Sequence, residues 1–129
     1  MVKKLEKVLI VDDEECHKEL IRHTIKKFGC TYNEASNVDE CRNHLNLSEY
    51  DLLIIDNHMP AETNRGRNQG VEFIETIKTT KMYPHMTIIL YSSSPDACNR
   101  AKELGVKSIE KDAMELRYYL QEHYLPNTQ

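Results

Sequence analysis

Short runs of apolar, mostly β-branched residues alternate with longer amphipathic stretches along the whole chain. This alternation is typical of βα units, in which helices cover a parallel sheet. Three of the runs are almost entirely apolar, as expected of strands that are covered on both faces. These runs are VLIV at 8–11, LLII at 52–55 and TIILY at 87–91. We therefore expect an α/β fold with these three strands at the centre of the sheet.

Five strands and five helices can be placed on the sequence. The expected strands cover residues 8–11, 31–35, 52–56, 87–91 and 106–109. Apolar residues at helical spacing predict helices over about 20–28, 38–45, 71–77, 96–104 and 112–124. Asn37 is a suitable N-cap for the second helix, while Gly29 and Gly105 would end the first and fourth. Five such repeats predict a flavodoxin-like doubly wound sheet of five parallel strands, in the order 2-1-3-4-5, with helices on both faces.

Length and composition favour a single soluble domain. With 129 residues, the chain is expected to form one domain over 1–129, with a core from about 7 to 124. The net charge is −4 and the basic residues are scattered, which argues against direct binding of nucleic acid. No apolar run approaches the roughly 18 residues of a membrane span, so we expect no membrane insertion. The four cysteines form no C-x-x-C pair, which favours reduced thiols in the cytoplasm.

Three carboxylates follow two of the central strands. Asp12 and Asp13 come after the first strand, and Asp56 ends the third. In the expected strand order these two strands are neighbours, and the switch point between them is where ligands bind in such sheets. Carboxylates packed together raise one another's pKa, so an ionised cluster calls for a cation. Oxygen ligands favour a hard ion such as Mg²⁺. Taken singly, an acid pair after a strand is most often a turn or a helix cap.

A hydroxyl residue and a lysine follow the last two strands. Ser92 comes after the fourth strand, in ILYSSS, and Lys111 after the fifth, in IEKD; Met59 and Pro60 follow the acid of the third strand in IIDNHMP. Either residue alone would be read as a loop or a solvent-facing side chain. Together with the acids, in this order and spacing, they make the chain resemble the CheY-like receiver domain of two-component response regulators. The resemblance covers roughly residues 7–124.

The resemblance implies a phosphoacceptor function. Asp56 would take a phosphoryl group from a histidine kinase or a histidine phosphotransfer protein and later lose it by self-dephosphorylation. Mg²⁺, with Mn²⁺ as an alternative ion, would be bound directly by Asp13 and Asp56, through water by Asp12, and by the backbone carbonyl of His58. The imidazole of His58 would border the path of the attacking water, where it would either position that water or shield the phosphoryl group.

The same resemblance gives roles to the remaining site residues and to a surface. Lys111 would contact the acceptor carboxylate and then a phosphoryl oxygen, while Ser92 would donate a hydrogen bond to another phosphoryl oxygen. A downstream protein partner would bind the face formed by the fourth helix, the fifth strand and the fifth helix, including Tyr118 and Tyr119. No second domain follows the fifth helix, so the chain either acts by binding a partner or was excised from a larger protein. Met1 before a complete first strand favours a natural N-terminus.

Two segments depart from the pattern of the family. The polar stretch 61–69 delays Gly70 by about six residues relative to the usual spacing. It is either a plain insertion or a basic flap over the site, carrying Arg65 and Arg67. In the fifth strand, Ser108 stands where an aromatic residue is usual, and an aspartate rather than a proline follows the lysine. Signalling through an inward movement of an aromatic side chain is therefore in doubt.

Other functions remain as alternatives. A metal-dependent phosphohydrolase with an aspartyl nucleophile would carry D-x-D after the first strand, where this chain has Asp12-Asp13. A mononucleotide binder would need a phosphate loop there, and four successive acids would repel a phosphate. A receiver scaffold that is not phosphorylated is disfavoured by the complete set of acids and the lysine. A transition-metal site at Cys16 and His17 is disfavoured because no matching H-x₃-H or C-x-x-C partner exists.

Overall fold

The computed structural model describes residues 3–57 and 69–125. Helices and strands alternate along the chain, as the sequence predicts, with one very short strand added at each end. The strands are β1 (Lys3–Lys4), β2 (Lys7–Val11), β3 (Thr31–Ala35), β4 (Leu52–Ile55), β5 (Thr87–Tyr91), β6 (Lys107–Ile109) and β7 (Tyr124–Leu125). The helices are α1 (Glu15–Lys26), α2 (Val38–Leu47), α3 (Gln69–Thr80), α4 (Pro95–Glu103) and α5 (Ala113–His123).

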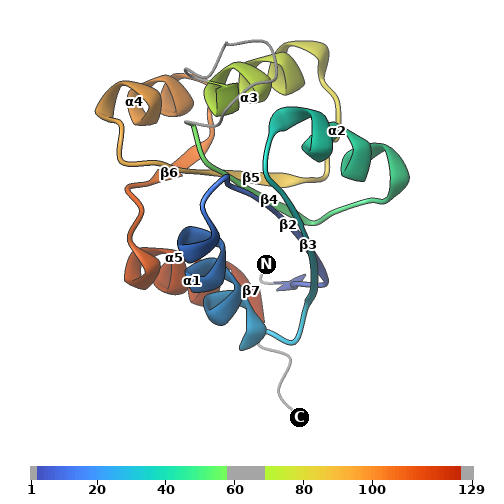
Figure 1. The fold of residues 1–129 in the computed structure, drawn as a ribbon, viewed down its shortest axis with the longest axis vertical. Helices are drawn as coiled ribbons and strands as arrows, with labels where there is room; N and C mark the ends of the chain where they lie inside the picture. The colour runs from blue at the N-terminus through green and yellow to red at the C-terminus, as the bar shows by residue number, and fades with distance from the viewer. Residues whose placement is uncertain (1–2, 58–68, 126–129) are drawn as a thin grey trace.

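The main sheet has five parallel strands in the order β3-β2-β4-β5-β6. Counted over the five expected strands, this is the order 2-1-3-4-5, so the predicted doubly wound topology is confirmed. Helices α1 and α5 cover one face of the sheet, and α2, α3 and α4 cover the other (Figure 1). The register pairs Val11 with both Ala35 and Ile55, and Ile55 with Leu90. The carboxyl ends of these strands therefore meet at one edge.

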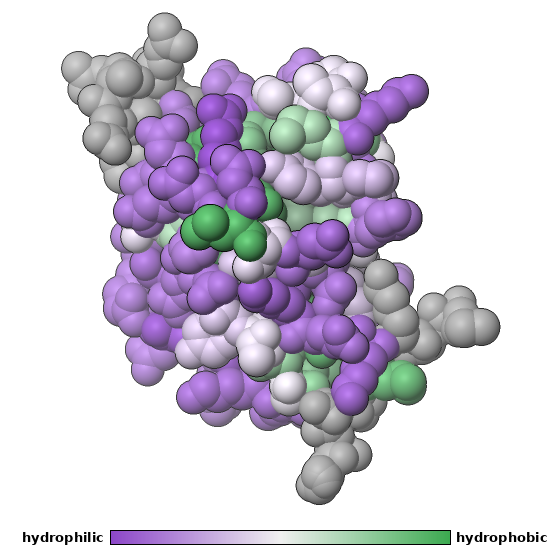
Figure 2. Space-filling view, turned by 90° about the vertical axis from the view of Figure 1, so that its right-hand side faces the viewer, coloured by the Kyte–Doolittle hydropathy of each residue, from purple (hydrophilic) through white to green (hydrophobic). Residues whose placement is uncertain are grey.

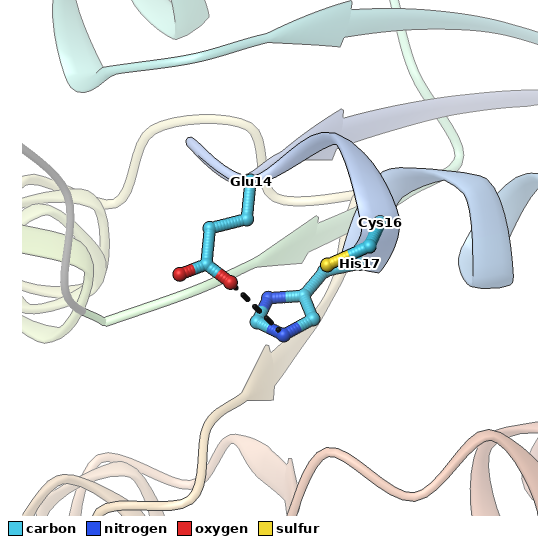
Figure 3. A group of neighbouring side chains, drawn as sticks. All are labelled: Glu14, Cys16 and His17. Carbon is cyan, nitrogen blue, oxygen red and sulfur yellow. Dashed lines mark ion pairs between the residues drawn. The ribbon is translucent and has the colours of Figure 1, made fainter.

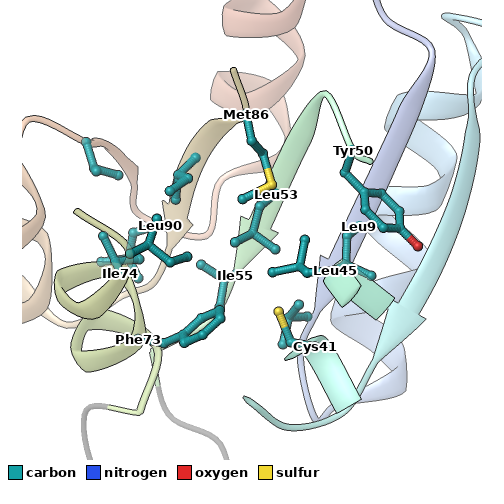
Figure 4. Close-up of a cluster of buried hydrophobic side chains, with 14 of the residues drawn as sticks. Leu9, Cys41, Leu45, Tyr50, Leu53, Ile55, Phe73, Ile74, Met86 and Leu90 are labelled. Atoms are coloured by element: carbon teal, nitrogen blue, oxygen red, sulfur yellow. The ribbon is translucent and has the colours of Figure 1, made fainter. Parts of the chain in front are cut away.

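Each face of the sheet has its own hydrophobic core. Along β2 and β4 alternate side chains enter opposite cores: Leu9 and Leu53 pack beneath α2 and α3 (Figure 4), whereas Val8 and Leu52 pack against α1 and α5. All four side chains are completely buried. Burial on both faces explains why the sequence of these strands shows continuous apolar runs rather than alternation.

Several predicted boundaries are confirmed and others move; α1 begins at Glu15 rather than near residue 20, and α3 continues to Thr80 rather than 77. Asn37 caps α2, because its side-chain oxygen accepts a hydrogen bond of 2.8 Å from the amide of Glu40. Helix α1 ends at Lys26, before the expected Phe28; the amides of residues 28 and 29 continue in a tighter turn, and Gly29 takes a φ of 68°. Strand β4 ends at Ile55, so Asp56 is the first residue after the strand.

The pairing of β1 with β7 was not predicted. Lys3 pairs with Tyr124 and Lys4 with Leu125, in parallel. The sequence favoured a fifth helix as far as Tyr124, but the helix ends at His123 and the buried Tyr124 begins a strand. Two-residue strands are too short to show a periodic pattern, so the sequence carried no signal for this pair.

The face of the molecule on the side of β3 and α2 is mostly hydrophilic, and its apolar residues form separate spots rather than a continuous patch (Figure 2). The exposed large apolar residues are spread over different elements: Leu20, Leu47, Met82, Met114, Tyr118 and Leu125. Within the described part of the chain, none of the helices combines the length and the apolar character that crossing a bilayer requires.

Candidate functional site

The three predicted acids lie together at the carboxyl edge of the sheet. One carboxylate oxygen each of Asp12, Asp13 and Asp56 lies within 4.8 Å of the others. The amide of Asp12 donates to the carbonyl of Ala35 at 3.0 Å, and the amide of Asp56 donates to that of Val11 at 2.9 Å. The backbone pairing of the sheet therefore continues one residue past the strands and fixes two of the acids. The juxtaposition expected from the sequence is confirmed.

Lys111 brings a positive charge to this cluster. Its Nζ lies 3.3 Å from Oδ1 of Asp56 and 3.8 Å from Oδ2 of Asp12. Lys111 has a φ of 50°, and its amide donates to the carbonyl of Ile109 at 2.9 Å. The left-handed conformation costs a residue with a side chain about 1 kcal/mol, and strain of this kind is common at functional sites. Asp112, which stands where a proline is usual in the resembled family, caps α5 by accepting from the amide of Met114 at 2.9 Å.

Two of the acids are buried. Asp12 is 0% and Asp56 4% exposed, whereas Asp13 is exposed. Burial raises the pKa of the Asp12 carboxyl, and the hydrogen bond from the Glu14 amide and the charge of Lys111 oppose this shift. The pKa of Asp56 is raised mainly by burial and also by the charge of Asp12, and the charge of Lys111 opposes this shift. One lysine therefore does not compensate the two buried carboxylates.

The cluster fits a hard divalent cation. Oδ1 of Asp12 accepts a hydrogen bond of 2.9 Å from the amide of Glu14, but none of the described residues donates a hydrogen bond to its buried Oδ2. A buried, unsatisfied carboxylate oxygen costs free energy unless another group binds it. The donor set consists of carboxylate oxygens alone, which is the set that Mg²⁺ and Mn²⁺ prefer. The residues present thus match the ion expected from the sequence.

Ser92 lies at the same edge, directly after β5. It is 1% exposed, and its amide donates to the carbonyl of Ile109 at 2.9 Å. Its Oγ accepts a hydrogen bond of 3.1 Å from the amide of Ser94. This bond leaves the hydroxyl proton available as a donor, which is the role expected for Ser92.

His58 and residues 61–68, including Arg65 and Arg67, lie outside the described residues. The expected metal contact of the His58 carbonyl, the role of its imidazole and the basic flap thus remain predictions.

The connection from Asp56 to α3 requires the glycine at position 70, which was notable in the sequence only for its spacing relative to the resembled family. A Cβ atom on Gly70 would lie 2.0 Å from the backbone oxygen of Asp56. The amide of Gly70 donates to the carbonyl of the buried Asn57 at 3.1 Å, and the Asn57 side-chain oxygen accepts from the amide of Val71 at 3.1 Å. This close backbone approach holds the segment that carries Asp56. A single glycine before an apolar periodic run gives no indication of such a contact.

His17 is a neighbour of the site that the sequence did not place there. Its Nδ1 lies 2.9 Å from Nζ of Lys111 and 3.4 Å from Oδ2 of Asp12. His17 and Lys111 are 94 residues apart, and they meet because α1 follows β2 directly and the β6–α5 connection reaches the same edge. Only the tertiary fold reveals this contact.

The expected partner surface comprises α4, β6 and α5. Tyr118 is exposed, whereas Tyr119 is partly buried and stacks on His123 with 4.0 Å between ring centroids. Ser108, which replaces the usual aromatic residue, is half-buried and pairs with Leu90 in the sheet. The element that would carry an aromatic switch in the resembled family thus has a small polar side chain here.

Known proteins share this sequence pattern and this fold. The sequence profile of a family described as response regulator receiver domain matches residues 8–115. The chain is 29% identical over 96 residues to the transcriptional regulatory protein ResD of Bacillus subtilis (strain 168), covering 74% of this chain and 36% of that protein. It is 27% identical over 111 residues to the sensory transduction protein LytR of Staphylococcus haemolyticus (strain JCSC1435), covering 84% of this chain and 38% of that protein.

Among solved structures, the signal receiver domain of an HD domain-containing protein from Pseudomonas fluorescens Pf-5 matches with a TM-score of 0.76. The sequence identity is 23%, and the match covers 95% of this chain and 89% of that chain. This likeness shows a common fold. The chain spans less than two fifths of the length of the curated relatives that it matches.

Proposed function

Because the chain belongs to the response regulator receiver domain family, we propose that it receives a phosphoryl group on Asp56 from a histidine kinase or a histidine phosphotransfer protein. One observation carries this proposal. The ammonium group of Lys111 lies 3.3 Å from the Asp56 carboxylate, in a pocket where a second buried carboxylate, Asp12, keeps an unsatisfied oxygen. A buried carboxylate oxygen without a hydrogen-bond donor among the described residues supports a site that binds a cation there.

The transfer is a substitution at phosphorus. A carboxylate oxygen of Asp56 attacks the phosphorus of a phosphohistidine; the new P–O bond forms as the P–N bond breaks, and the electron pair stays on the imidazole, which takes a proton from solvent. The product is an acyl phosphate. Attack of water on its phosphorus later releases inorganic phosphate and restores the carboxylate, so one site accepts the group and sheds it.

Asp12, Asp13 and Asp56 would hold Mg²⁺, or Mn²⁺ in its place, together with the backbone carbonyl of His58. When bound, the ion neutralises charge on the acids and on the phosphoryl oxygens, two groups that otherwise repel each other. Asp13 is exposed, so it offers a ligand without the desolvation cost of the buried pair. We assign direct contacts to Asp13 and Asp56 and a contact through water to Asp12.

Lys111 and Ser92 act on the phosphoryl oxygens. Before transfer, Lys111 holds the carboxylate of Asp56 in its ionised, nucleophilic form, opposing the effect of burial on its pKa. After transfer, the same ammonium is in reach of an oxygen of the attached group, and the hydroxyl of Ser92 donates to another. In this proposal a change of these two contacts, from Ser92 directly after β5 and from Lys111 after β6, reports the modification.

The modified domain would bind a downstream protein through α4, β6 and α5. On this face the side chain of Tyr118 is exposed, and we expect a bound partner to bury it. With Ser108 in place of an aromatic residue, the signal would leave through the backbone of the β5–α4 connection, where the amide of Ser94 is held by Ser92. We propose a cytoplasmic module that binds proteins and not nucleic acid directly.

Incubation with a small-molecule phosphodonor and Mg²⁺, followed by intact-mass measurement, tests the proposal. We expect one labile phosphoryl addition, and none in Asp56→Asn. Asp51→Asn, at the other end of β4, is the matched control and should still be modified. The absence of any addition with either Mg²⁺ or Mn²⁺ would leave a scaffold that is not phosphorylated, and steady release of phosphate from unrelated phosphate esters would indicate a phosphohydrolase.

A further inference from the structure

Three potential metal ligands of mixed chemistry gather at the start of α1, beside the acid cluster. A carboxylate oxygen of Glu14, the Sγ of Cys16 and a ring nitrogen of His17 lie within 4.8 Å of one another. Glu14 and Cys16 are exposed, and His17 is half-buried. The Glu14 carboxylate and the His17 ring turn toward each other, with the sulfur of Cys16 beside them (Figure 3). The group is thus open to solvent on one side and to the pocket on the other.

The two nitrogens of His17 face different neighbours. Nε2 lies 3.2 Å from Oε1 of Glu14. Nδ1 lies 2.9 Å from Nζ of Lys111 and 3.4 Å from Oδ2 of Asp12. Because the ammonium of Lys111 has only donors, Nδ1 accepts from it in this arrangement, and the proton of a neutral ring is on Nε2, donating to Glu14.

We propose that Glu14, Cys16 and His17 form a second metal site, which binds a transition-metal ion of the Zn²⁺ type. Thiolate, imidazole and carboxylate are the ligands that Zn²⁺ takes in proteins, and three protein ligands with one position left to water are a common set. The neighbouring cluster offers carboxylates alone and therefore selects a hard ion. The two sites differ in chemistry although they share the start of one helix.

The buried oxygen of Asp12 supplies the support that a metal-binding histidine requires. Such histidines usually donate their second ring N–H to a carboxylate, which fixes the tautomer. With the ion on Nε2, the ring remains neutral: it loses the Nε2 proton, gains one on Nδ1 and donates it to Oδ2 of Asp12. The thiol of Cys16 releases its proton to solvent on binding. The oxygen that has no donor among the described residues thereby gains one.

Occupation of this site would act on the phosphoacceptor pocket. Once Nδ1 carries a proton, it no longer accepts from Lys111, whose remaining partners in the site are the carboxylates of Asp12 and Asp56. The ion would thus shift Lys111 away from His17 and toward the acids. The consequence for phosphotransfer rests on the proposed function, whereas ion binding itself does not.

Titration of the reduced protein with Co²⁺, in the presence of saturating Mg²⁺, tests the site. We expect a thiolate-to-cobalt charge-transfer absorption that saturates at one ion per chain and is displaced by Zn²⁺. Cys16→Ser should abolish this absorption and His17→Gln should weaken Co²⁺ binding by about tenfold or more. Cys30→Ser and Asp13→Asn are the matched controls, and both should keep the thiolate-to-cobalt absorption. Absence of the band, its persistence in Cys16→Ser, or saturation at one ion per two chains would overturn the proposal.

The histidine tautomer gives a second, independent measurement. In long-range proton–nitrogen spectra, Zn²⁺ should convert His17, among the six histidines of the chain, from the form protonated on Nε2 to the form protonated on Nδ1. His23, on the same helix, should stay unchanged. Unchanged His17 signals at saturating Zn²⁺ would contradict the site. Cys16→Ser should be phosphorylated by a small phosphodonor without Zn²⁺ to the same extent as the original protein, which would show that this variant folds. If Asp56 is not phosphorylated at all, the Co²⁺ titration and the His17 spectra still decide whether the second metal site exists.

Discussion

The two ends of β4 each carry an aspartate, and their surroundings differ in kind. At the amino end, Asp51 lies before the strand, and its Oδ2 accepts hydrogen bonds from the amides of Glu6 at 2.9 Å and Lys7 at 3.0 Å. At the carboxyl end, Asp56 lies buried beside Asp12, and the pair shares one lysine. Four residues of one strand separate a half-buried carboxylate held by two backbone amides from a buried carboxylate that lies beside a second acid.

We propose that this difference separates a structural acid, Asp51, from the phosphoacceptor, Asp56. The backbone of Asp51 also links three strands, because its amide donates to Lys7 and its carbonyl accepts from Thr87, both at 2.9 Å. Its charge stabilises the start of the sheet. At the other edge the fold keeps one unsatisfied carboxylate oxygen, on Asp12, and two neighbouring buried acids, which reduce stability. In the proposed function, binding of a cation and a phosphoryl group would make this arrangement favourable.

The largest change in the free energy of unfolding is expected from substituting glycines, one at the carboxyl edge of the sheet and one at the amino edge. Gly70→Ala should lower the free energy of unfolding by about 3 kcal/mol, because the added Cβ meets the Asp56 carbonyl oxygen at 2.0 Å and the backbone has to move. Gly105→Ala, before β6, should cost about 1 kcal/mol: its Cβ meets no described atom within 4 Å, but its φ is +78°. Urea unfolding measures both. Equal losses would mean that the approach at Gly70 is not tight.

At the amino end, Asp51→Ala should lower the free energy of unfolding by about 2 kcal/mol, because two backbone donors lose a charged acceptor. Asp51→Asn keeps a side-chain oxygen and should lose less than half as much. Chemical denaturation of the three proteins gives the comparison. If Asp51→Ala left the free energy of unfolding unchanged, the proposed difference between the aspartates at the two ends of β4 would be wrong.

At the carboxyl end, Asp56→Asn should stabilise the metal-free protein at neutral pH by about 1 kcal/mol. Burial and Asp12 raise the pKa of Asp56 in the folded state, so the folded state holds the proton more tightly than the unfolded state. Stability is therefore lost as the pH rises from the ordinary value of 3.8 to the raised folded value, and the advantage of Asp56→Asn should appear over that interval.

Melting curves of the original protein and of Asp56→Asn, recorded over a range of pH without divalent ions, measure this difference in stability. Below the ordinary pKa the two should be equally stable. Mg²⁺ should stabilise the original protein at neutral pH far more than Asp56→Asn. A variant that is less stable than the original at neutral pH, in the absence of Mg²⁺, would show that the ion pair with Lys111 outweighs burial.

The sequence was sufficient for the features that repeat along the chain. Continuous apolar runs identified the central strands, and the strand order then brought Asp12, Asp13 and Asp56 to one edge. The N-cap role of Asn37 followed from residue type alone. These features depend on local pattern and on topological rules that hold for all such sheets.

Three contacts made by loops and termini could not be predicted in this way. The approach of Gly70 to Asp56, the meeting of His17 with Lys111 and the pairing of β1 with β7 depend on how loops and termini pack once the sheet exists. None of them repeats along the chain, and each involves at most two residues of a segment. Cys16 and His17 have no partner in a metal-binding sequence motif, whereas the structure places Glu14, from the preceding turn, beside them.

The most direct test of the account is to locate the phosphoryl group. Borohydride reduces an acyl phosphate on aspartate to homoserine, which marks the modified residue permanently for peptide mapping. After treatment with a small phosphodonor and Mg²⁺, we expect homoserine at position 56, with Asp12, Asp13 and Asp51 intact. Homoserine at position 12, 13 or 51, or at no position although the protein binds Mg²⁺, would contradict the claim that Asp56 is the phosphoacceptor.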